Sequence, residues 1–237
     1  MSMPKLSVVI PMYNENEICA ECAEKLTAAL NGYFPDRDYE IVFSDDGSTD
    51  GCRGKVDSLG LDRVRTVGYS DNRGKGSAVR EGLLACRGEH AVYTDCDLAY
   101  GTDAIFEIYE KSLGHDIAIG SRVIHPDGYT GYTRLRKLMS KMYLAAVRLL
   151  SGFKYSDSQC GLKCLSRKAI DGIMPQCVIN SFAFDLEILI LADKQKLDVV
   201  EYPAKIICNR DRGSKVSPVK DAVKMIKDVM KIKKLHK

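Results

Sequence analysis

Two aspartates that flank a single cysteine have the spacing that most directly suggests chemistry. Asp95 and Asp97 follow an apolar stretch at residues 90–94. In an extended segment, residues i and i+2 point the same way, and neighbouring carboxylates repel each other unless a positive charge lies between them. A hard divalent cation with oxygen ligands, Mg²⁺ or Mn²⁺, supplies that charge and can neutralise a departing diphosphate. A D-x-D pattern alone also fits a solvated loop, so the position of the two aspartates in the fold decides between a metal site and a loop.

A glycine-rich segment, NRGKGS at residues 72–77, is a candidate anion site. Gly74 and Gly76 let the backbone approach a ligand, Arg73 and Lys75 add positive charge, and the start of a helix favours anions. The segment is not a Walker A loop, because glycine stands where Ser or Thr should follow the lysine. A tight turn with exposed cations is the alternative interpretation.

Two further acidic residues, Asp45 and Asp46, end a second apolar stretch. An acidic residue in that place can accept hydrogen bonds from a base N–H or from ribose hydroxyls. Asp followed by Gly also simply makes turns, and the pattern alone leaves both interpretations open.

The elements that must position these residues alternate between strand and helix. We predict strands at 6–10, 39–44, 64–69, 90–94 and 117–120, and helices at 15–30, 76–86 and 103–112. The second half predicts helices at 133–150, 182–194 and 218–235, a strand at 159–165 and an extended segment at 197–207. This order predicts an α/β domain with a mostly parallel central sheet and helices on both faces. Ligands bind beyond the carboxyl ends of such strands, where the polar clusters of the first half fall.

Composition narrows the class of protein. The chain has 237 residues, 45% hydrophobic and 28% charged, and a net charge of +3 gives no argument for a nucleic acid partner. Nine scattered cysteines and no predicted signal peptide favour a reducing, cytoplasmic compartment. The single C-x-x-C, Cys19 and Cys22, lacks a second pair for zinc. No apolar run reaches the ~18–20 residues that span a bilayer, so membrane contact is expected to be peripheral or through an anchoring partner protein.

Eight segments in order carry a family resemblance. VVIPMYNE (8–15), DDGSTD (45–50), NRGKG (72–76) and DCD (95–97) resemble the signature of family 2 glycosyltransferases. GSR (120–122), DSQCGLK (157–163), FDLE (184–187) and GSK (213–215) resemble the dolichyl- or polyprenyl-phosphate hexosyltransferases. The D-x-Q-C-G-x-K segment is most similar to the glucosyl branch, with mannosyl enzymes as near relatives. The resemblance covers about residues 6–215, and its specificity lies in the order of the segments.

The resemblance implies a glycosyltransferase-A (Rossmann-like) fold in one catalytic domain, residues 1–237. About 1–125 would bind a nucleotide-sugar donor, of UDP-glucose or GDP-mannose type, and about 126–237 the acceptor. Donor-binding positions would be Pro11, Tyr13, Glu15, Asp45, Asp46, Arg73, Lys75 and Lys215. Asp95 and Asp97 would hold the metal and diphosphate, and Arg122, Arg136 and Ser140 would face the acceptor phosphate. Two departures stand out: Ala99 replaces a polar metal ligand found in some relatives, and the segment 208–210 lacks an aromatic residue found in the glucosyl branch.

The implied reaction is an inverting, single in-line displacement on the sugar. A phosphate monoester has a second pKa of about 6 and is mostly dianionic at neutral pH, so it needs no general base. It needs cationic positioning, which we expect from Arg122 and Arg136. An alcohol acceptor would need a base, for which Asp185 and Asp157 are the candidates. The alternatives are therefore a transferase acting on a glycan or other hydroxyl, and a non-catalytic nucleotide-sugar-binding module.

The end of the chain bears on the membrane. Residues 220–237 hold seven lysines against two aspartates, and apolar residues recur there at helical spacing. This pattern predicts a basic amphipathic helix suited to an anionic leaflet, which would place the enzyme at the cytoplasmic face of a membrane beside a lipid-phosphate acceptor. A core-packed helix with a basic outer face is the alternative. The sequence leaves open a homo-oligomer.

Overall fold

A seven-stranded mixed sheet organises the molecule. The computed structural model describes residues 3–129, 134–207 and 218–236, with the backbone alone at 134–139 and 218–226. The strands lie in the order β3-β2-β1-β4-β6-β5-β7, and β6 alone runs antiparallel to its neighbours. Their bounds are β1 Leu6–Met12, β2 Tyr39–Asp46, β3 Val64–Tyr69, β4 His90–Tyr93, β5 Ile117–Ser121, β6 Lys163–Ser166 and β7 Val199–Pro203.

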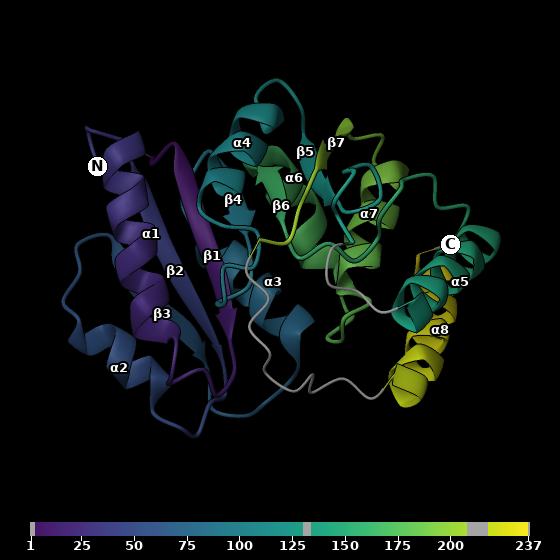
Figure 1. Cartoon of the computed structure of the whole chain (residues 1–237), viewed down its shortest axis with the longest axis horizontal. Coiled ribbons are helices and arrows are strands. Elements are labelled where there is room, and N and C mark those ends of the chain that lie inside the picture. The colour runs from purple at the N-terminus through teal and green to yellow at the C-terminus, as the bar shows by residue number, and fades with distance from the viewer. Residues whose placement is uncertain (1–2, 130–133, 208–217, 237) are drawn as a thin grey trace.

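Helices cover both faces of this sheet (Figure 1). One apolar core joins the sheet to α1 (Cys19–Tyr33), α2 (Cys52–Ser58) and α4 (Asp103–Ser112). A second core, on the other face, joins it to α3 (Lys75–Ala85), α6 (Arg167–Ile173), the short 3₁₀ turn η1 (Met174–Gln176) and α7 (Phe184–Lys194). Strands buried on both faces are continuous apolar runs, as in VVI of β1, because neither face meets water.

Two helices of the second half pack side by side at one end of the molecule. Figure 1 shows α5 (Arg134–Ser151) beside α8 (Pro218–Leu235), to the right of α7. Val147 of α5 and Val229 and Ile232 of α8 are buried in the second core. The last ten described residues of the chain therefore present one face to the protein interior, and their lysines point outward.

The predicted architecture is confirmed, with corrections at element ends. The predicted helix at 15–30 was wrong at its start: Glu15 and the next three residues form a turn, and α1 begins at Cys19. The short helices α2 and α6 were not predicted, since seven residues give too few turns for a clear periodicity. The strand predicted at 159–165 was wrong at its start: β6 begins at Lys163, is four residues long and runs antiparallel to its neighbours.

Candidate active site

The carboxylate of Asp46 organises the glycine-rich loop. It lies at the end of β2, is buried, and accepts hydrogen bonds from the backbone N–H groups of Arg73 (2.9 Å) and Gly74 (2.9 Å). The Asn72 side chain (2.9 Å) and the Tyr69 hydroxyl (2.7 Å) donate to it as well. One carboxylate thus satisfies the backbone of a turn that would otherwise have unpaired donors. Asp46 sets the position of the loop that begins α3.

The loop after β1 is fastened to the loop after β2. Ser48 receives the backbone N–H of Asn14 at 3.0 Å, and the Asn14 side chain accepts from the backbone N–H of Thr49 at 2.9 Å. Asn14 has a φ of 53°, a left-handed conformation that Asn tolerates better than most residues. Pro11 is buried at the end of β1, while Tyr13 is 39% exposed. Asp45 accepts the Ser48 N–H at 3.1 Å, so the predicted nucleoside-binding positions share one edge of the sheet.

Lys75 and Asp95 form an ion pair at the centre of this edge. The Lys75 ammonium lies 2.5 Å from an Asp95 carboxylate oxygen, and both side chains retain some exposure. Burial alone would lower the pKa of Lys75, but the carboxylates of Asp95 and Asp185 outweigh burial and raise it. Lys75 is therefore a permanent cation facing two acidic groups from different elements.

Gly161 leaves room for this pair. A Cβ at that position would lie 2.8 Å from the second carboxylate oxygen of Asp95 and 3.6 Å from the Lys75 ammonium. Such a contact is closer than side chains tolerate, so only glycine lets the 157–163 segment pass this near. The backbone of that segment therefore forms one wall around Asp95.

Asp97 begins a strained turn. Its carboxylate accepts the backbone N–H of Ala99 at 3.0 Å. Leu98, between them, has a φ of 50°, a left-handed conformation that costs a residue with a Cβ roughly 1–2 kcal/mol. Strain of this kind persists where the surrounding structure fixes it, and it concentrates at functional sites. The turn holds Asp97 just beyond the end of β4.

Asp95 and Asp97 are ligands of the type that a divalent cation takes. Asp95 and Asp97 lie beyond the end of β4, each partly exposed. Within residues 3–129, 134–207 and 218–236, no group of three or more His, Cys, Asp or Glu side chains is arranged to ligate a metal. Mg²⁺ commonly takes one or two carboxylates and completes its shell with phosphate oxygens and water. Asp95 and Asp97 fit this mode of binding, and Lys75 lies beside them as a second positive charge.

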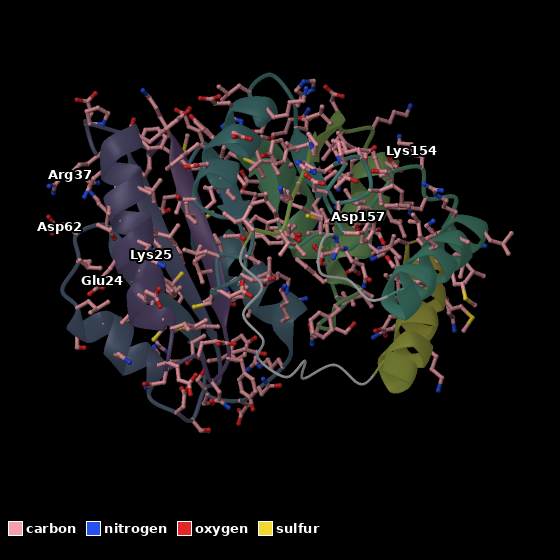
Figure 2. The ribbon with its side chains drawn as sticks, viewed as in Figure 1. Glu24, Lys25, Arg37, Asp62, Lys154 and Asp157 are labelled. Atoms are coloured by element: carbon pink, nitrogen blue, oxygen red, sulfur yellow. The ribbon has the colours of Figure 1, made fainter. Side chains whose placement is uncertain are left out.

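Arg122 and Asp157 form a buried, two-pronged ion pair. The guanidinium donates to both carboxylate oxygens, at 2.8 and 3.0 Å, with the two side chains 13% and 6% exposed. Figure 2 labels Asp157 within the crowded interior, whereas Arg37 and Asp62, an exposed pair, lie at the outer edge. Burial alone would raise the pKa of Asp157, but the Arg122 charge outweighs burial and holds that pKa below its usual value.

Asp185 is held at the start of α7 by a buried lysine. The Lys163 ammonium lies 2.5 Å from a carboxylate oxygen of Asp185 and also donates to the Cys160 carbonyl at 2.6 Å. The Tyr93 hydroxyl donates to the same carboxylate oxygen at 2.5 Å. Lys163 is fully buried, so its charge is balanced inside the protein by Asp185.

One face of α5 lies near Asp185. Ser140 and Tyr143 are three residues apart and share a face with the buried Val147. Within the described part of the chain, the buried Tyr143 hydroxyl has no hydrogen-bond partner. Burial, with the nearby carboxylates of Asp185 and Asp228, raises the pKa of Tyr143, so this phenol remains a hydrogen-bond donor.

The predicted site residues are thus partly brought together. Asp46, Arg73, Lys75 and Asp95 meet at one edge of the sheet, with Asp185 close to Lys75. Arg122 pairs with Asp157, which belongs to the segment 157–163 whose Gly161 lies against Asp95. The side chain of Arg136 lies outside the described part of the structure, as does Lys215 altogether.

Sequence reasoning assigned no role to three residues that shape the site: Tyr93, Gly161 and Lys163. The segment 157–163 contacts Arg122 through Asp157, Asp95 through Gly161 and Asp185 through Lys163. The available signal was a lysine between apolar residues at 162–165 and a glycine just before them, because neither is common in such a place without a specific reason.

Replacing Asp46 by Ala is expected to weaken binding of free nucleotide. The change leaves the N–H groups of Arg73 and Gly74 without their acceptor, and each lost bond to a charged group costs about 1.5–3 kcal/mol. Titration calorimetry of UDP and GDP with Mn²⁺ measures the effect. Unchanged affinity in a folded variant would show that the loop does not contribute to nucleotide binding.

Comparison with known proteins identifies the family. The model of glycosyl transferase family 2 matches residues 7–173. A dolichyl-phosphate beta-glucosyltransferase of Saccharomyces cerevisiae is 32% identical over 96% of this chain and 74% of its own length. The glycosyltransferase AglD of Haloferax volcanii is 30% identical over 96% of this chain but only 36% of its own.

Among solved structures, glucosyl-3-phosphoglycerate synthase of Mycobacterium tuberculosis, in complex with Mn²⁺, UDP and glucosyl-3-phosphoglycerate, superimposes with a TM-score of 0.67. The match has 20% identity and covers 97% of this chain and 78% of that one. At this level of identity the likeness establishes the fold.

Proposed function

The chain belongs to glycosyl transferase family 2, and from that premise we propose that it transfers a hexose from a nucleotide-sugar to a polyprenyl phosphate with inversion at the sugar. The relatives named dolichyl-phosphate beta-glucosyltransferase support glucose and a dolichyl-type phosphate as the first substrates to test. The observation that carries the choice of acceptor is the pairing of both candidate bases with buried or nearly buried cations.

An alcohol acceptor would need one of those bases. Asp157 is locked by the two-pronged contact with Arg122, and Asp185 is held by Lys163 and Tyr93. A carboxylate that already neutralises a buried cation is a poor proton acceptor, since protonating it leaves that cation unpaired. A phosphate dianion arrives deprotonated and avoids this cost.

The donor half of the site follows from the loops around Asp46. We place the nucleoside against Pro11, Tyr13, Glu15 and Asp45, and the diphosphate beside Arg73 and Lys75 at the start of α3. Main-chain N–H groups at a helix start and two cations favour an anion there. Asp95 and Asp97 would hold Mg²⁺ or Mn²⁺, which when bound neutralises charge on the leaving nucleoside diphosphate. Lys75 supplies a second positive charge to the same leaving group.

The acceptor half is the face of α5 near Asp185. We place the acceptor phosphate among Arg122, Arg136, Ser140 and the Tyr143 hydroxyl. Cations and hydroxyls hold one phosphate oxygen in line with the sugar–diphosphate bond, and positioning of this kind supplies much of the catalysis when no proton has to move. Lys215 is proposed to approach the donor phosphates from the segment after β7.

Contact with the membrane would come from the second half. None of the helices within the described ranges is long and apolar enough to cross a bilayer. On α8, Lys227, Lys231, Lys233 and Lys234 are exposed, and Met230 is 52% exposed among them. We propose that this face meets an anionic leaflet, where each lysine contributes about 1 kcal/mol. As part of the same proposal, the enzyme binds the cytoplasmic face of that membrane.

Replacing Tyr143 by Phe is expected to raise the KM for polyprenyl phosphate several-fold and leave donor affinity unchanged. The hydroxyl has no partner in the described structure, so its removal should not lower the melting temperature. Tyr155→Phe is the matched control: its hydroxyl donates to Asp193 at 2.7 Å, so that variant should lose stability and keep its acceptor KM. An unaltered acceptor KM in Tyr143→Phe would remove Tyr143 from the site.

The function is tested with Arg136 variants in a sugar-transfer assay. Arg136→Ala should raise the KM for polyprenyl phosphate without altering nucleotide-sugar affinity, since a charge-assisted contact to a dianion is lost. Arg136→Lys should recover only part of the loss, because an ammonium cannot reproduce a two-pronged contact. Equal acceptor KM values in all three proteins would contradict the placement of the acceptor on α5.

A further inference from the structure

The C-terminal helix is joined to the donor loop by one short connecting segment, residues 177–181. Asp228 of α8 accepts a hydrogen bond from the Ser181 hydroxyl at 2.6 Å. His236, just after α8, lies 2.8 Å from a carboxylate oxygen of Glu187 in α7. His236 is 10% exposed and Glu187 is fully buried, so this contact is shielded from water.

Glu187 also binds the connecting segment. Its carboxylate accepts the backbone N–H of Val178 at 3.1 Å and of Ile179 at 2.9 Å. A buried carboxylate with these partners has a fixed orientation, because the adjacent N–H groups of Val178 and Ile179 reach it from one segment and the imidazole of His236 from another. His236 and the segment 177–181 are therefore positioned by the same side chain, that of Glu187.

The connecting segment in turn packs on the donor loop. The Asn180 carbonyl accepts the backbone N–H of Gly76 at 2.9 Å, and Arg80 of α3 donates to the Cys177 carbonyl at 2.9 Å. A Cβ on Gly76 would lie 2.8 Å from the Ser181 carbonyl, so the two segments touch without room for a side chain. Gly76 directly follows Lys75, the cation paired with Asp95.

We propose that Asp228 and His236 are positioning residues for the nucleotide-sugar donor: α8 holds the segment 177–181, and that segment holds the start of α3 with Lys75 in place. The inference rests on the proposed function, because it takes the donor diphosphate to bind at Lys75. It makes α8 part of the donor site, although α8 lies at the opposite end of the molecule from β2 and β3 (Figure 1).

The test is calorimetric binding of UDP and of GDP, each with Mn²⁺, to the full chain. His236→Ala and Asp228→Ala should each weaken the better-binding nucleotide by about fivefold or more, the lower range for coupled sites. His236→Gln keeps an N–H donor and Asp228→Asn keeps an oxygen acceptor, so both should recover most of the affinity. Leu235→Ala, at an exposed position of the same helix, should bind like the parent protein.

A second measurement uses the reciprocity of coupling. If α8 supports nucleotide binding, nucleotide must stabilise the docking of α8, and amide hydrogen exchange in residues 227–236 should slow when nucleotide and Mn²⁺ are added. Ser181→Ala, which removes only one hydroxyl, should reduce this protection and serves if the larger changes fail to fold.

The outcomes separate the two proposals. Parent protein that binds neither nucleotide overturns the proposed function and this inference with it. Parent protein that binds nucleotide, together with folded His236→Ala and Asp228→Ala variants of equal affinity, overturns the inference alone. The inference is supported if the alanine variants lose affinity and the conservative variants regain it. A general loss of stability would not depend on whether the replacement keeps the hydrogen bond.

Discussion

Replacing Asp97 by Asn is expected to lower turnover by roughly 10²–10³-fold while the fold is retained. The change removes one of two charges available to a divalent cation. Such a cation stabilises the departing phosphate by several kcal/mol, and each tenfold change in rate corresponds to about 1.4 kcal/mol. The amide oxygen can still accept the Ala99 N–H, so the turn at Leu98 should persist. Steady-state transfer rates with Mn²⁺, and circular dichroism for the fold, measure the two parts.

Asp103→Asn is the matched control for that change. Asp103 lies six residues further along, exposed in the first turn of α4, and its replacement should leave turnover within a few-fold of the parent. Full activity of Asp97→Asn, or full activity of the parent in excess chelator, would contradict the assignment of a metal to the two aspartates.

Replacing Lys163 by Met is expected to destabilise the protein by about 3–5 kcal/mol. The change removes the cation in direct contact with Asp185, which keeps the Tyr93 hydroxyl as a hydrogen-bond partner, and a buried charge that loses its contacting partner carries a cost of this size. For a chain of this length each kcal/mol corresponds to about 2–4 °C, so the melting temperature should fall by about 6–20 °C. Denaturant and thermal unfolding both report it.

The double variant Lys163→Met, Asp185→Asn should regain much of that stability, since neither charge is then left alone. Lys168→Met provides a second reference: Lys168 pairs with Asp116 at 2.9 Å but its side chain is 71% exposed, and such pairs contribute about 0–1 kcal/mol. A small effect of Lys163→Met, equal to that of Lys168→Met, would show that Asp185 is neutral or solvated in the folded protein.

The part of the fold predicted from sequence is the part that local pattern controls. The apolar runs of β1 and β2 and the polar turns that end them predicted a parallel sheet with a site at its carboxyl edge, and the comparisons confirm the family that the ordered segments resemble. Strand β6 was harder, because four residues carry no periodicity and its antiparallel direction depends on the path of the chain through 152–162.

The pairings inside the site lay beyond sequence reasoning. Arg122 and Asp157 are 35 residues apart, and Lys163 and Asp185 are 22 apart. Residue types show which charges exist, but only the packed sheet brings a particular pair together. Asp46 illustrates the same limit: its position at the end of β2 suggested contact with a nucleoside, whereas the structure shows that it binds the loop at 72–74. Its part in nucleotide binding stays a prediction.

The central claim is that the acceptor is a phosphate carried on a lipid. The most direct measurement is transfer of radiolabelled hexose to a short-chain polyprenyl phosphate, beside the matching polyprenol and a soluble glycan, in the same detergent with Mn²⁺. We expect product with the phosphate alone, because the carboxylates that would activate an alcohol are paired with Arg122 and Lys163. Transfer to the free polyprenol as fast as to its phosphate, or transfer to the glycan only, would contradict the account and favour a hydroxyl acceptor.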